Sequence, residues 1–374
     1  MLNLMRRCAR DFDQVLVSFV EEQQPPAPEL LDICAEVVQV HRIGSHLRPV
    51  TSRPAMVEEF ASAAFAASLE LAVKKWRPAV VQLEFTHMAQ YARHCRPART
   101  ILVEHDITME LHAQFARLER SNRETERERQ RWEQFETEAW RSVDAVVAMS
   151  EADRQLVTGA PCAVIPNGVD LLRFQPGPVE PDRARILFVG SFAHLPNVLA
   201  IDFFLREVWD QLGPLHPRLH IIAGARHRYY LERYQDLVTL NLDRPDIEVD
   251  DFVADVRPAY HRASVVIAPL VASAGTNIKI MEAMAMGKAI VTTRAGIHGL
   301  DEIRPGRDVV VANTGAEMAA GILEVLSDPL RRRGLETEAR NAAVEHYDWE
   351  KIAQRQVDLY YGMAGQQTPL SGGA

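Results

Sequence analysis

The chain has 374 residues, of which 47% are hydrophobic and 25% charged, a composition that excludes a disordered or fibrous protein. A chain of this length exceeds one compact core, so we expect two domains. The net charge is −9 and both halves are acidic, which excludes nucleic-acid binding through a generally basic surface.

The cysteine pattern and the N-terminal residues bear on the cellular compartment. The four cysteines lie far apart without a C-x-x-C pair, which favours reduced thiols over a disulfide framework or a zinc site. No apolar run reaches the roughly 18 residues that a membrane span requires. The opening MLNLMRRCARDFD lacks the long apolar stretch of a signal peptide. We therefore expect a cytoplasmic protein.

Short apolar, β-branched runs alternate with helical segments, and this predicts parallel strands covered by helices on both faces. The predicted strands fall into two series, 14–20, 36–41, 79–85, 100–105, 145–149 and 163–166, then 185–189, 220–223, 247–249, 264–269 and 289–293. Between them, QPGPVEPDRAR (Gln175–Arg185) is rich in proline and charge, which predicts a linker. The fold class is therefore α/β, with two doubly wound domains and a cleft between them as the default ligand site.

Two further segments are distinguished by their polar residues. Arg117–Glu133 holds six Arg and five Glu at helical spacing, which predicts a solvated, ion-paired helix. The alternative is a dock for an anionic membrane surface, which would place the protein peripherally at the inner membrane face. Near the end, we expect a C-terminal helix over 348–365 that returns to the N-terminal domain, and a disordered tail over 366–374.

The strongest functional signal is the stretch Val265–Val291, VVIAPLVASAGTNIKIMEAMAMGKAIV. It predicts a buried strand, a loop of small residues and a helix that begins near Thr276. A helix that begins at the carboxyl end of a parallel strand offers free backbone N–H groups to an anion, and Gly275 would let a phosphate approach the backbone closely. The alternative is an ordinary strand–loop–helix connection with a glycine for its turn.

Glu282 and Lys279 are charged residues in this otherwise apolar helix. A buried carboxylate is costly unless it accepts hydrogen bonds, and a pair of ligand hydroxyl groups would supply such bonds to Glu282. Lys279 could meet a phosphate. The alternative, which the spacing alone favours, is a structural Lys279–Glu282 ion pair.

The run AGTNIKIMEAMAMGKAIV resembles the donor-binding segment of the retaining glycosyltransferases of family 4, which have the GT-B fold. Three further stretches follow the family's order and spacing: VIPNGVDLLRF (Val164–Phe174), ILFVGSFAHLPN (Ile186–Asn197) and VDDFVADVRPAYHRASVVIAP (Val249–Pro269). The resemblance is strong over 143–347 and weaker before it. It implies two Rossmann-like domains facing a central cleft, an acceptor-side domain over 1–172 and a nucleotide-sugar-binding domain over 173–347.

The resemblance also implies how a nucleotide-diphosphate sugar binds to the C-terminal domain. Gly275, Thr276 and Asn277 match the backbone that meets the diphosphate, and Glu282 matches the acid that accepts the ribose hydroxyls. Gly190 matches the glycine after the first strand of this domain. The family needs no essential metal and no cofactor beyond its substrate, so positive groups and helix dipoles must stabilise the leaving diphosphate.

The loop at Phe252 and Val253 matches the family's base-contacting loop, and elsewhere the chain departs from the family's pattern. Many members carry an Arg and a Lys after the first-strand glycine, where this chain has Ser191 and Asn197. A further Glu of the family is replaced by Ala274. The loss of two cations removes part of the charge stabilisation at the diphosphate, and Lys279 is the residue that could replace them.

The N-terminal half should shape the acceptor site, because α/β proteins place working residues at the carboxyl ends of parallel strands. Two predicted strands end beside Glu84 and His87 and beside His105 and Asp106. A His or Glu there could orient the acceptor or meet the transferred sugar, so these four are the candidate catalytic residues. The alternative is that each His is a surface or hydrogen-bonded structural residue.

The chain opens without the hydrophobic strand and glycine-rich turn that begin a doubly wound domain. LNLMRRCARDF (Leu2–Phe12) predicts the first helix, and QVLVSFV predicts the second strand. In the resembled family the first strand is central to the sheet. We therefore expect that a strand and a turn, about 20 to 25 residues, precede this sequence, and that the sheet lacks its middle strand without them.

Together these features predict a retaining, hexosyl-type glycosyltransferase that acts in polysaccharide or glycoconjugate biosynthesis, with a saccharide or a lipid-linked acceptor. The alternative is a nucleotide-sugar-binding protein of the same fold without turnover, which Ser191, Asn197 and Ala274 favour. An oxidoreductase or a P-loop NTPase fits poorly, because neither G-x-G-x-x-G nor G-x-x-x-x-G-K-[ST] follows a predicted strand.

Overall fold

The computed structural model describes the chain except for residues 23, 43–50, 118–122, 179, 274 and 366–374. Two compact units divide it: unit 1 comprises Met1–Pro166 and Trp349–Ala374, and unit 2 comprises Asn167–Asp348. The C-terminal helix α14 (Trp349–Met363) belongs to unit 1. The predicted tail lies outside the described residues.

The predicted linker Gln175–Arg185 is wrong, because its described residues lie inside unit 2. The Asp182 N–H donates to the carbonyl of Arg262, and the Asp182 carboxylate pairs with the Arg262 guanidinium at 2.9 Å. The segment rich in proline and charged residues therefore packs on unit 2 and does not connect the two units. The chain changes units after Pro166, rather than at the predicted boundary of 172.

Unit 2 is built on a parallel sheet with the strand order β12–β11–β10–β7–β8–β9. β7 is its central strand, since it pairs with β8 on one edge and with β10 on the other. Ile186, Leu187 and Phe188 of β7 are fully buried as a result. The strands are β7 (Arg185–Val189), β8 (Arg218–Ile222), β9 (Ile247–Asp250), β10 (Val265–Ala268), β11 (Ile290–Thr292) and β12 (Val310–Val311), of which the two-residue β12 was not predicted.

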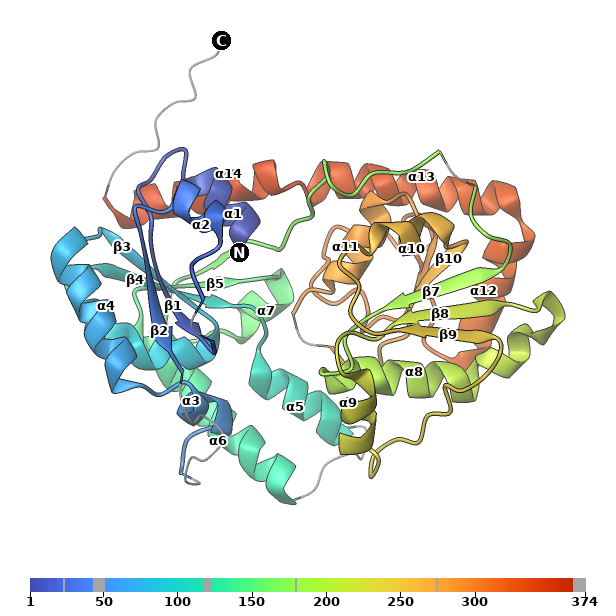
Figure 1. Cartoon of the computed structure of the whole chain (residues 1–374), viewed down its shortest axis with the longest axis horizontal. Helices are drawn as coiled ribbons and strands as arrows, with labels where there is room; N and C mark the ends of the chain where they lie inside the picture. Colours follow the sequence, from blue (N-terminus) through green and yellow to red (C-terminus); the bar gives the residue numbers. More distant parts are fainter. Residues whose placement is uncertain (23, 43–50, 118–122, 179, 274, 366–374) are drawn as a thin grey trace, which may run out of the picture. The chain divides into compact units, whose positions relative to one another are not determined.

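Helices cover both faces of the unit 2 sheet (Figure 1). One face carries α8 (Leu195–Glu207), η3 (Trp209–Leu215) and α12 (Gly315–Ser327), which pack against one another. The other carries α10 (Arg257–Arg262), α11 (Ile278–Ala285) and α13 (Pro329–His346), which share one apolar core. The short α9 (His227–Arg233) follows β8.

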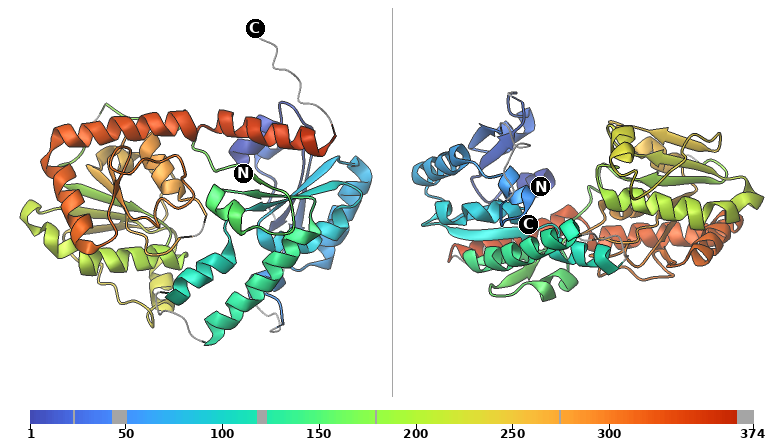
Figure 2. Two further views of the ribbon diagram at one scale, coloured as in Figure 1. Left: turned by 180° about the vertical axis from the view of Figure 1, so that it is seen from behind. Right: turned by 90° about the horizontal axis from the view of Figure 1, so that it is seen from below.

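The described strands of unit 1 form two parallel sheets rather than one. β1 (Val15–Val20) pairs with β2 (Glu36–His41), while β3 (Val80–Glu84), β4 (Arg99–Glu104), β5 (Ala145–Ala148) and β6 (Cys162–Val164) form the second sheet in that order. Figure 2 shows β1 and β2 as a pair of arrows separate from β3 and β4. All residues of β1 are half-buried, whereas all those of β5 are buried.

The helices of unit 1 lie on both sides of its strands. α4 spans the two sheets, because its Phe65 ring stacks on Phe19 of β1 at 4.2 Å and shares an apolar core with Leu83 of β3. Besides α14, the helices are α1 (Leu2–Cys8), α2 (Pro28–Ile33), α3 (Ala55–Glu59), α4 (Ala63–Trp76), η2 (Thr86–Cys95), α5 (Thr108–Arg117), α6 (Arg123–Ser142) and α7 (Glu151–Leu156).

The predicted ion-paired helix corresponds to α6, although residues 118–122 lie outside the described part. Arg129 pairs with Glu126 at 2.8 Å and with Glu133 at 3.0 Å, which confirms the ion pairing. In the described part of the chain, no helix is long and apolar enough to cross a membrane.

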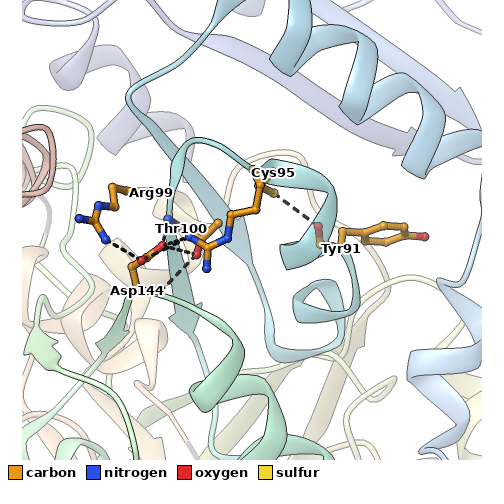
Figure 3. Close-up of polar contacts among 6 residues, drawn as sticks. Tyr91, Cys95, Arg99, Thr100 and Asp144 are labelled. Atoms are coloured by element: carbon orange, nitrogen blue, oxygen red, sulfur yellow. Dashed lines mark hydrogen bonds and ion pairs between the residues drawn. The ribbon is translucent and has the colours of Figure 1, made fainter.

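A polar cluster fixes the amino ends of β4 and β5 (Figure 3). The Asp144 carboxylate accepts hydrogen bonds from the N–H and hydroxyl of Thr100, at 2.8 and 2.9 Å, and from Arg99 at 2.9 Å. Burial would raise the pKa of Asp144, but these bonds lower it to about 2. The cluster thus holds the register of β4 and β5 at the end of the sheet opposite to the candidate catalytic residues.

Candidate functional site

The candidate donor site of unit 2 begins at Gly190, directly after β7. Its N–H donates to the carbonyl of Ile222 in β8. A Cβ at this position would lie 2.7 Å from Asn197 Oδ1 and 2.9 Å from Lys279 Nζ. Glycine is therefore required for these two side chains to meet over the end of β7.

Lys279 lies in the first turn of α11, with its ammonium group near β7. Nζ donates to Asn197 Oδ1 at 2.5 Å and lies 4.9 Å from the centre of the Phe188 ring. Burial lowers the pKa of Lys279 to about 7, although the charge of Glu282 opposes this shift. The alternative of a structural Lys279–Glu282 ion pair is not realised, since within the described residues the ammonium bonds to a neutral amide instead.

Asn197, near the start of α8, holds the ammonium in place. Its Nδ2 donates to the carbonyl of Ser191 at 2.8 Å, and this bond directs Oδ1 toward Lys279. Ser191 and Asn197 stand where the resembled family has its two cations. The Lys279 ammonium group of α11 thus lies beside Asn197 of α8, at the position where the resembled family has one of its cations.

Glu282 lies one turn after Lys279 on α11. Its Oε2 accepts a hydrogen bond from the Tyr260 hydroxyl at 3.1 Å, and that hydroxyl also lies 3.2 Å from the carbonyl of Lys279. Burial raises the pKa of Glu282, while the Tyr260 bond and the charges of Arg173 and Lys279 offset part of the rise. Sequence reasoning missed Tyr260, which lies in the YHR segment of α10 without a motif of its own. One neutral donor leaves most of this carboxylate's bonding capacity for a ligand.

The loop before α11 combines a left-handed glycine, an N-cap side chain that is bonded elsewhere and a hydroxyl group that has no partner among the described residues. Gly275 has a φ of +67°, a left-handed conformation that favours glycine. Asn277 is the N-cap residue, yet its side chain donates to Ser273 and Gly296 rather than capping the helix. The Thr276 hydroxyl oxygen is buried without a hydrogen-bond partner in the described structure. The helix begins at Ile278, two residues after the predicted start, and Ala274 lies outside the described residues.

The predicted base-contacting loop follows β9. The Phe252 side chain is 73% exposed, whereas Val253 packs against the core of unit 2. The loop thus exposes the Phe252 ring to solvent, while the next residue, Val253, attaches the loop to the core of unit 2. Nearby, His227 Nδ1 bonds to Asp251 and connects α9 to this loop.

In unit 1 the structure brings together two of the four candidate catalytic residues. His105 Nε2 lies 2.7 Å from Glu84 Oε2, and the Phe85 ring lies 4.3 Å from the His105 ring. Burial would raise the pKa of Glu84, but hydrogen bonds from His105 and Gln82 lower it. The pair lies at the carboxyl ends of β3 and β4.

His87 and Asp106 lie apart from this hydrogen-bonded pair. His87 is only 8% exposed, and its ring lies 4.3 Å from the Phe60 ring. Burial lowers the pKa of His87 to about 4, so it is neutral at physiological pH. This placement favours the structural alternative for His87. Asp106 is exposed, and its charge acts on the buried carboxyl groups of Glu104 and Glu136.

Glu104 and Glu136 were not predicted. Glu104, the last residue of β4, accepts hydrogen bonds from Thr86 and from Trp140 Nε1, and burial raises its pKa to about 8. Glu136 accepts from the first two N–H groups of α5 at 2.7 and 2.9 Å, and burial raises its pKa to about 7. The N–H groups of Thr108 and Met109 at the start of α5 therefore already have an acceptor, and they are not available to a ligand phosphate. The signal for Glu104 was an acid at the end of an apolar strand, directly before His105.

A third cluster, in unit 2, has a geometry that could hold a metal ion. The nearest ligand atoms of His220, Glu248 and Asp250 all lie within 4.8 Å of one another. The buried guanidinium of Arg185 pairs with Glu248 at 2.5 Å. The protein thus supplies the positive charge that these carboxylates require, which favours an internal ion-pair network over a metal site.

Two family models match the chain. One, described as Glycosyl transferases group 1, matches residues 183–328, and the other, described as Glycosyltransferase Family 4, matches residues 1–173. The first match lies entirely in unit 2, and the second lies almost entirely in unit 1.

Among curated proteins, the chain is similar to the phosphatidyl-myo-inositol mannosyltransferase of Mycolicibacterium smegmatis. The two are 28% identical over 229 residues, which are 58% of this chain and 56% of that protein. The matches to curated relatives span between 46% and 65% of the length of those proteins.

Two solved structures resemble the chain over nearly its whole length. The sucrose-phosphate synthase of Thermosynechococcus elongatus has a TM-score of 0.73 at 16% identity, covering 97% of this chain and 92% of that one. HepE of Anabaena in complex with UDP-glucose has a TM-score of 0.70 at 15% identity, covering 96% and 95%. At these identities the likeness shows the fold, which is the GT-B fold predicted from the sequence.

Proposed function

This chain belongs to the group 1 glycosyltransferases of family 4, and we propose that it moves a sugar from a nucleotide-diphosphate donor to an acceptor with retention of configuration. The observation that carries the proposal is the convergence at the end of β7 of the Lys279 ammonium, the Gly190 backbone and the uncapped start of α11. A cation and free N–H groups around one point are what a diphosphate requires.

The diphosphate of the donor binds between Lys279 and the loop Gly275–Asn277. The ammonium exchanges its bond to the neutral Asn197 amide for one to a charged oxygen, and the orphan Thr276 hydroxyl gains an acceptor. Charge-assisted bonds of this kind are stronger than neutral ones. The same groups stabilise the negative charge that develops on the leaving diphosphate, so the reaction needs no metal at this position.

Glu282 accepts the ribose hydroxyls, and the loop at Phe252 and Val253 contacts the base. The carboxylate retains bonding capacity beside Tyr260, and two ligand hydroxyl groups side by side fill it. Because burial raises the pKa of Glu282, these donors also stabilise its charged form. The nucleotide that HepE binds contains such a ribose.

Unit 1 supplies the acceptor side. His105 contacts the acceptor or the transferred sugar, and Glu84 is a positioning residue that fixes the His105 ring through its 2.7 Å hydrogen bond. The acceptor is a saccharide or a lipid-linked saccharide in polysaccharide or glycoconjugate assembly. The lipid option draws support from the mannosyltransferase relative, whose name includes a phosphatidylinositol. It would require a peripheral membrane contact, for which α6 is the candidate.

The test is a thermal-shift panel with UDP, GDP and ADP on this chain and on Glu282→Ala. A ligand that binds only the folded state raises the melting temperature as its concentration exceeds the dissociation constant. We expect a shift with one nucleotide that is lost in Glu282→Ala and retained in Glu324→Ala. Glu324 is the matched control, because its carboxylate forms an exposed ion pair with Arg331 on the outer helices. No shift with any of the three nucleotides would contradict the proposal.

A nucleotide-sugar-binding protein without turnover is the second candidate. The observation that favours it is that Ser191 and Asn197 are neutral, so Lys279 provides the cation of this site without their help. Fewer cations lower the stabilisation of the leaving group more than they lower ground-state binding. Release of labelled sugar from the nucleotide sugar that binds would exclude this candidate.

A further inference from the structure

The face of β3 that meets α14 carries two polar residues. Val81 and Leu83 belong to the apolar core that α4 also lines. Successive side chains of a strand alternate between its faces, so the even-numbered residues of β3 point to the opposite face. There, Val80 packs against the core that contains residues of α14, and Gln82 and Glu84 follow it toward the end of the strand. Both β3 and α14 belong to unit 1.

α14 presents two donors to the side chain of Gln82. Gln356 and Tyr360 are four residues apart and therefore lie on one face of this helix. The Gln356 Nε2 atom donates to Gln82 Oε1 at 3.1 Å, and the Tyr360 hydroxyl donates to the same oxygen at 2.7 Å. Burial raises the pKa of the Tyr360 hydroxyl, so this group keeps the hydrogen that it donates.

Gln82 in turn donates to Glu84. Its Nε2 atom lies 2.7 Å from Glu84 Oε1, and the other carboxylate oxygen, Oε2, lies 2.7 Å from His105 Nε2. Side chains from α14, from β3 and from the residue after β4 thus form one hydrogen-bonded chain. It ends at the imidazole ring of His105.

The direction of each bond in this chain follows from the groups themselves. Burial would raise the pKa of Glu84, but the bonds from His105 and Gln82 lower it, so this acid is a carboxylate and only accepts hydrogen bonds. Gln82 must therefore point its NH2 group to Glu84, which leaves its carbonyl oxygen for α14. With the amide reversed, two acceptors would face each other at 2.7 Å. Because Glu84 Oε2 also needs a donor, His105 Nε2 carries a hydrogen.

The other ring nitrogen of His105 is open to a ligand. Within the described residues Nδ1 has no hydrogen-bond partner, and the side chain is 22% exposed. The Phe85 ring lies 4.3 Å from the imidazole, and the backbone of Phe85 has a φ of +72°. A bulky residue adopts this conformation rarely and at a cost in free energy, and such strain is concentrated at ligand sites.

The bonds to Gln82 could instead serve only to hold α14 on the sheet, but the helix has other anchors. Ile352 is 1% exposed, and Glu350 pairs with Arg7 and with Arg10 of the N-terminal segment, each at 2.8 Å. Gln356 is also 1% exposed, and burial of an amide is costly unless it forms hydrogen bonds. A leucine would fill this place without needing a partner. The group to which Gln356 donates therefore explains its presence best.

We propose that α14 fixes the imidazole of the acceptor side from a distance. Gln356 and Tyr360 hold Gln82, and Gln82 holds Glu84 in the orientation that keeps a hydrogen on His105 Nε2. The Nδ1 atom of the neutral ring then accepts a hydrogen bond from a carbohydrate hydroxyl. Gln82, Gln356 and Tyr360 are positioning residues, since each acts on the ligand through His105. The identity of the ligand rests on the proposed function, whereas the state of the ring does not.

The first test observes the ring nitrogens of His105 by NMR on the whole chain, labelled with nitrogen-15 histidine and without ligand. The signals that disappear in His105→Gln are those of His105. At about pH 8.5, where an ordinary imidazole is neutral, we expect Nε2 to be protonated and Nδ1 to be unprotonated. A neutral ring with its hydrogen on Nδ1 would overturn the proposal.

The second test compares Tyr360→Phe with Tyr361→Phe. Tyr361 is the matched control, because its ring packs on Phe12 and its hydroxyl has no hydrogen bond in the part of the chain that the structure describes. The Nε2–H hydrogen of His105 should exchange with water about threefold faster in Tyr360→Phe, the effect of one lost hydrogen bond. In Tyr361→Phe its rate should stay as it is in the unchanged chain.

Gln82→Met removes every bond between α14 and Glu84, while its side chain still fills the space. It should accelerate the exchange of the Nε2–H hydrogen about tenfold. Exchange rates in Tyr360→Phe and Gln82→Met that equal the rate in Tyr361→Phe would overturn the role of α14.

The third test adds UDP-glucose, GDP-mannose or ADP-glucose, each compared with its own nucleoside diphosphate. If the hydroxyl belongs to the transferred sugar, the nucleotide sugar moves the Nδ1 signal and the diphosphate does not. If it belongs to the acceptor, the signal moves only after methyl glucoside or methyl mannoside is added to that complex. No movement in any of these samples, when the nucleotide raises the melting temperature, would overturn the assignment of Nδ1. If no nucleotide raises the melting temperature, the proposed function fails instead, and the exchange rates alone decide the role of α14.

Discussion

In unit 2 the strand β7 has a neighbour on each edge, its central residues are fully buried, and the glycine that follows it opens onto Lys279 and Asn197. In unit 1 the described strands form two separate sheets, in which β1 pairs with β2 and β3 pairs with β4, and every residue of β1 is half-buried. The comparison shows why a central strand matters for function. The carboxyl end of a central strand lies between the two halves of its sheet, so loops from both halves can reach one ligand there.

The two units also differ in the hydrogen-bond partners of their buried charged side chains. In unit 2, Lys279 bonds to a neutral amide and Glu282 to a hydroxyl, so both keep bonding capacity for a ligand. In unit 1, Glu84 is bonded to His105 and Gln82, and Glu136 caps α5. Internal partners already satisfy these acids. The proposed donor site therefore keeps charged groups available for a ligand, whereas the acids of the proposed acceptor side form an internally bonded network.

The largest expected effect comes from Gly190→Ala. The added Cβ would lie within 3 Å of Asn197 Oδ1 and Lys279 Nζ, and because both are ends of flexible side chains, the fold survives while they move. Loss of one or two charge-assisted bonds to the diphosphate costs about 3 kcal/mol, or about a hundredfold in nucleotide affinity. Isothermal titration with the nucleotide that binds measures it.

Gly334→Ala is the control for this substitution, since a Cβ there would meet nothing within 4 Å. It should bind nucleotide as the unchanged chain does. Unchanged nucleotide affinity in Gly190→Ala would show that the nucleotide does not bind at the end of β7. It would contradict the difference drawn between the two units.

A smaller effect is expected for Lys279→Met, about tenfold in nucleotide affinity at pH 6.5. The pKa of Lys279 is about 7, so its ammonium loses its charge as the pH rises through 7. The affinity of the unchanged chain should therefore fall toward that of Lys279→Met, by up to about tenfold in total, as the pH rises above 7, while the affinity of Lys279→Met should hardly change between pH 7 and 8.5. Parallel pH profiles for the two chains would contradict the assigned role.

The smallest effect is expected in unit 1, for Glu104→Gln. The pKa of Glu104 is raised to about 8 in the folded state, so the folded chain keeps a proton that the unfolded chain has lost. Its stability contribution is complete below about pH 4.5 and is lost as the pH rises toward 8. Gln is neutral and can still bond to Thr86 and Trp140. The variant should gain about 1 kcal/mol over the unchanged chain between pH 7 and pH 8.

Urea unfolding at the two pH values measures this difference. The other titrating groups are common to both chains, so the difference reports Glu104 together with its electrostatic coupling to Glu136. A pH-independent difference would mean that Glu104 is charged in the folded state, and the contrast between internally bonded acids in unit 1 and open ones in unit 2 would fail.

Much of the fold was accessible from the sequence because its signals are local. The runs 36–41 and 185–189 predicted β2 and β7 with the same bounds as the structure has, since short runs rich in Val, Ile and Leu are typical of parallel strands. The segment Gln175–Arg185 was misassigned, because proline and charge report the lack of regular structure and not the contacts that Asp182 makes with Arg262.

The candidate donor site was predicted only in part. Glu282 and Lys279 stand out in the sequence as charges on an apolar helix, but the partner of each comes from a distant element. Spacing along one helix favoured a Lys279–Glu282 pair, whereas the fold brings Asn197 and Tyr260 to these side chains from α8 and α10. Such contacts depend on how the helices pack on the sheet, and no local pattern encodes them.

The most direct test of the central claim, that unit 2 holds the donor nucleotide, is a hydrogen-exchange footprint of the chain with and without saturating UDP, GDP or ADP. We expect one nucleotide to slow exchange at 190–197 and 275–282, around Gly190 and the start of α11, and at the loop around Phe252. Protection confined to unit 1, or none with any of the three, would contradict the account.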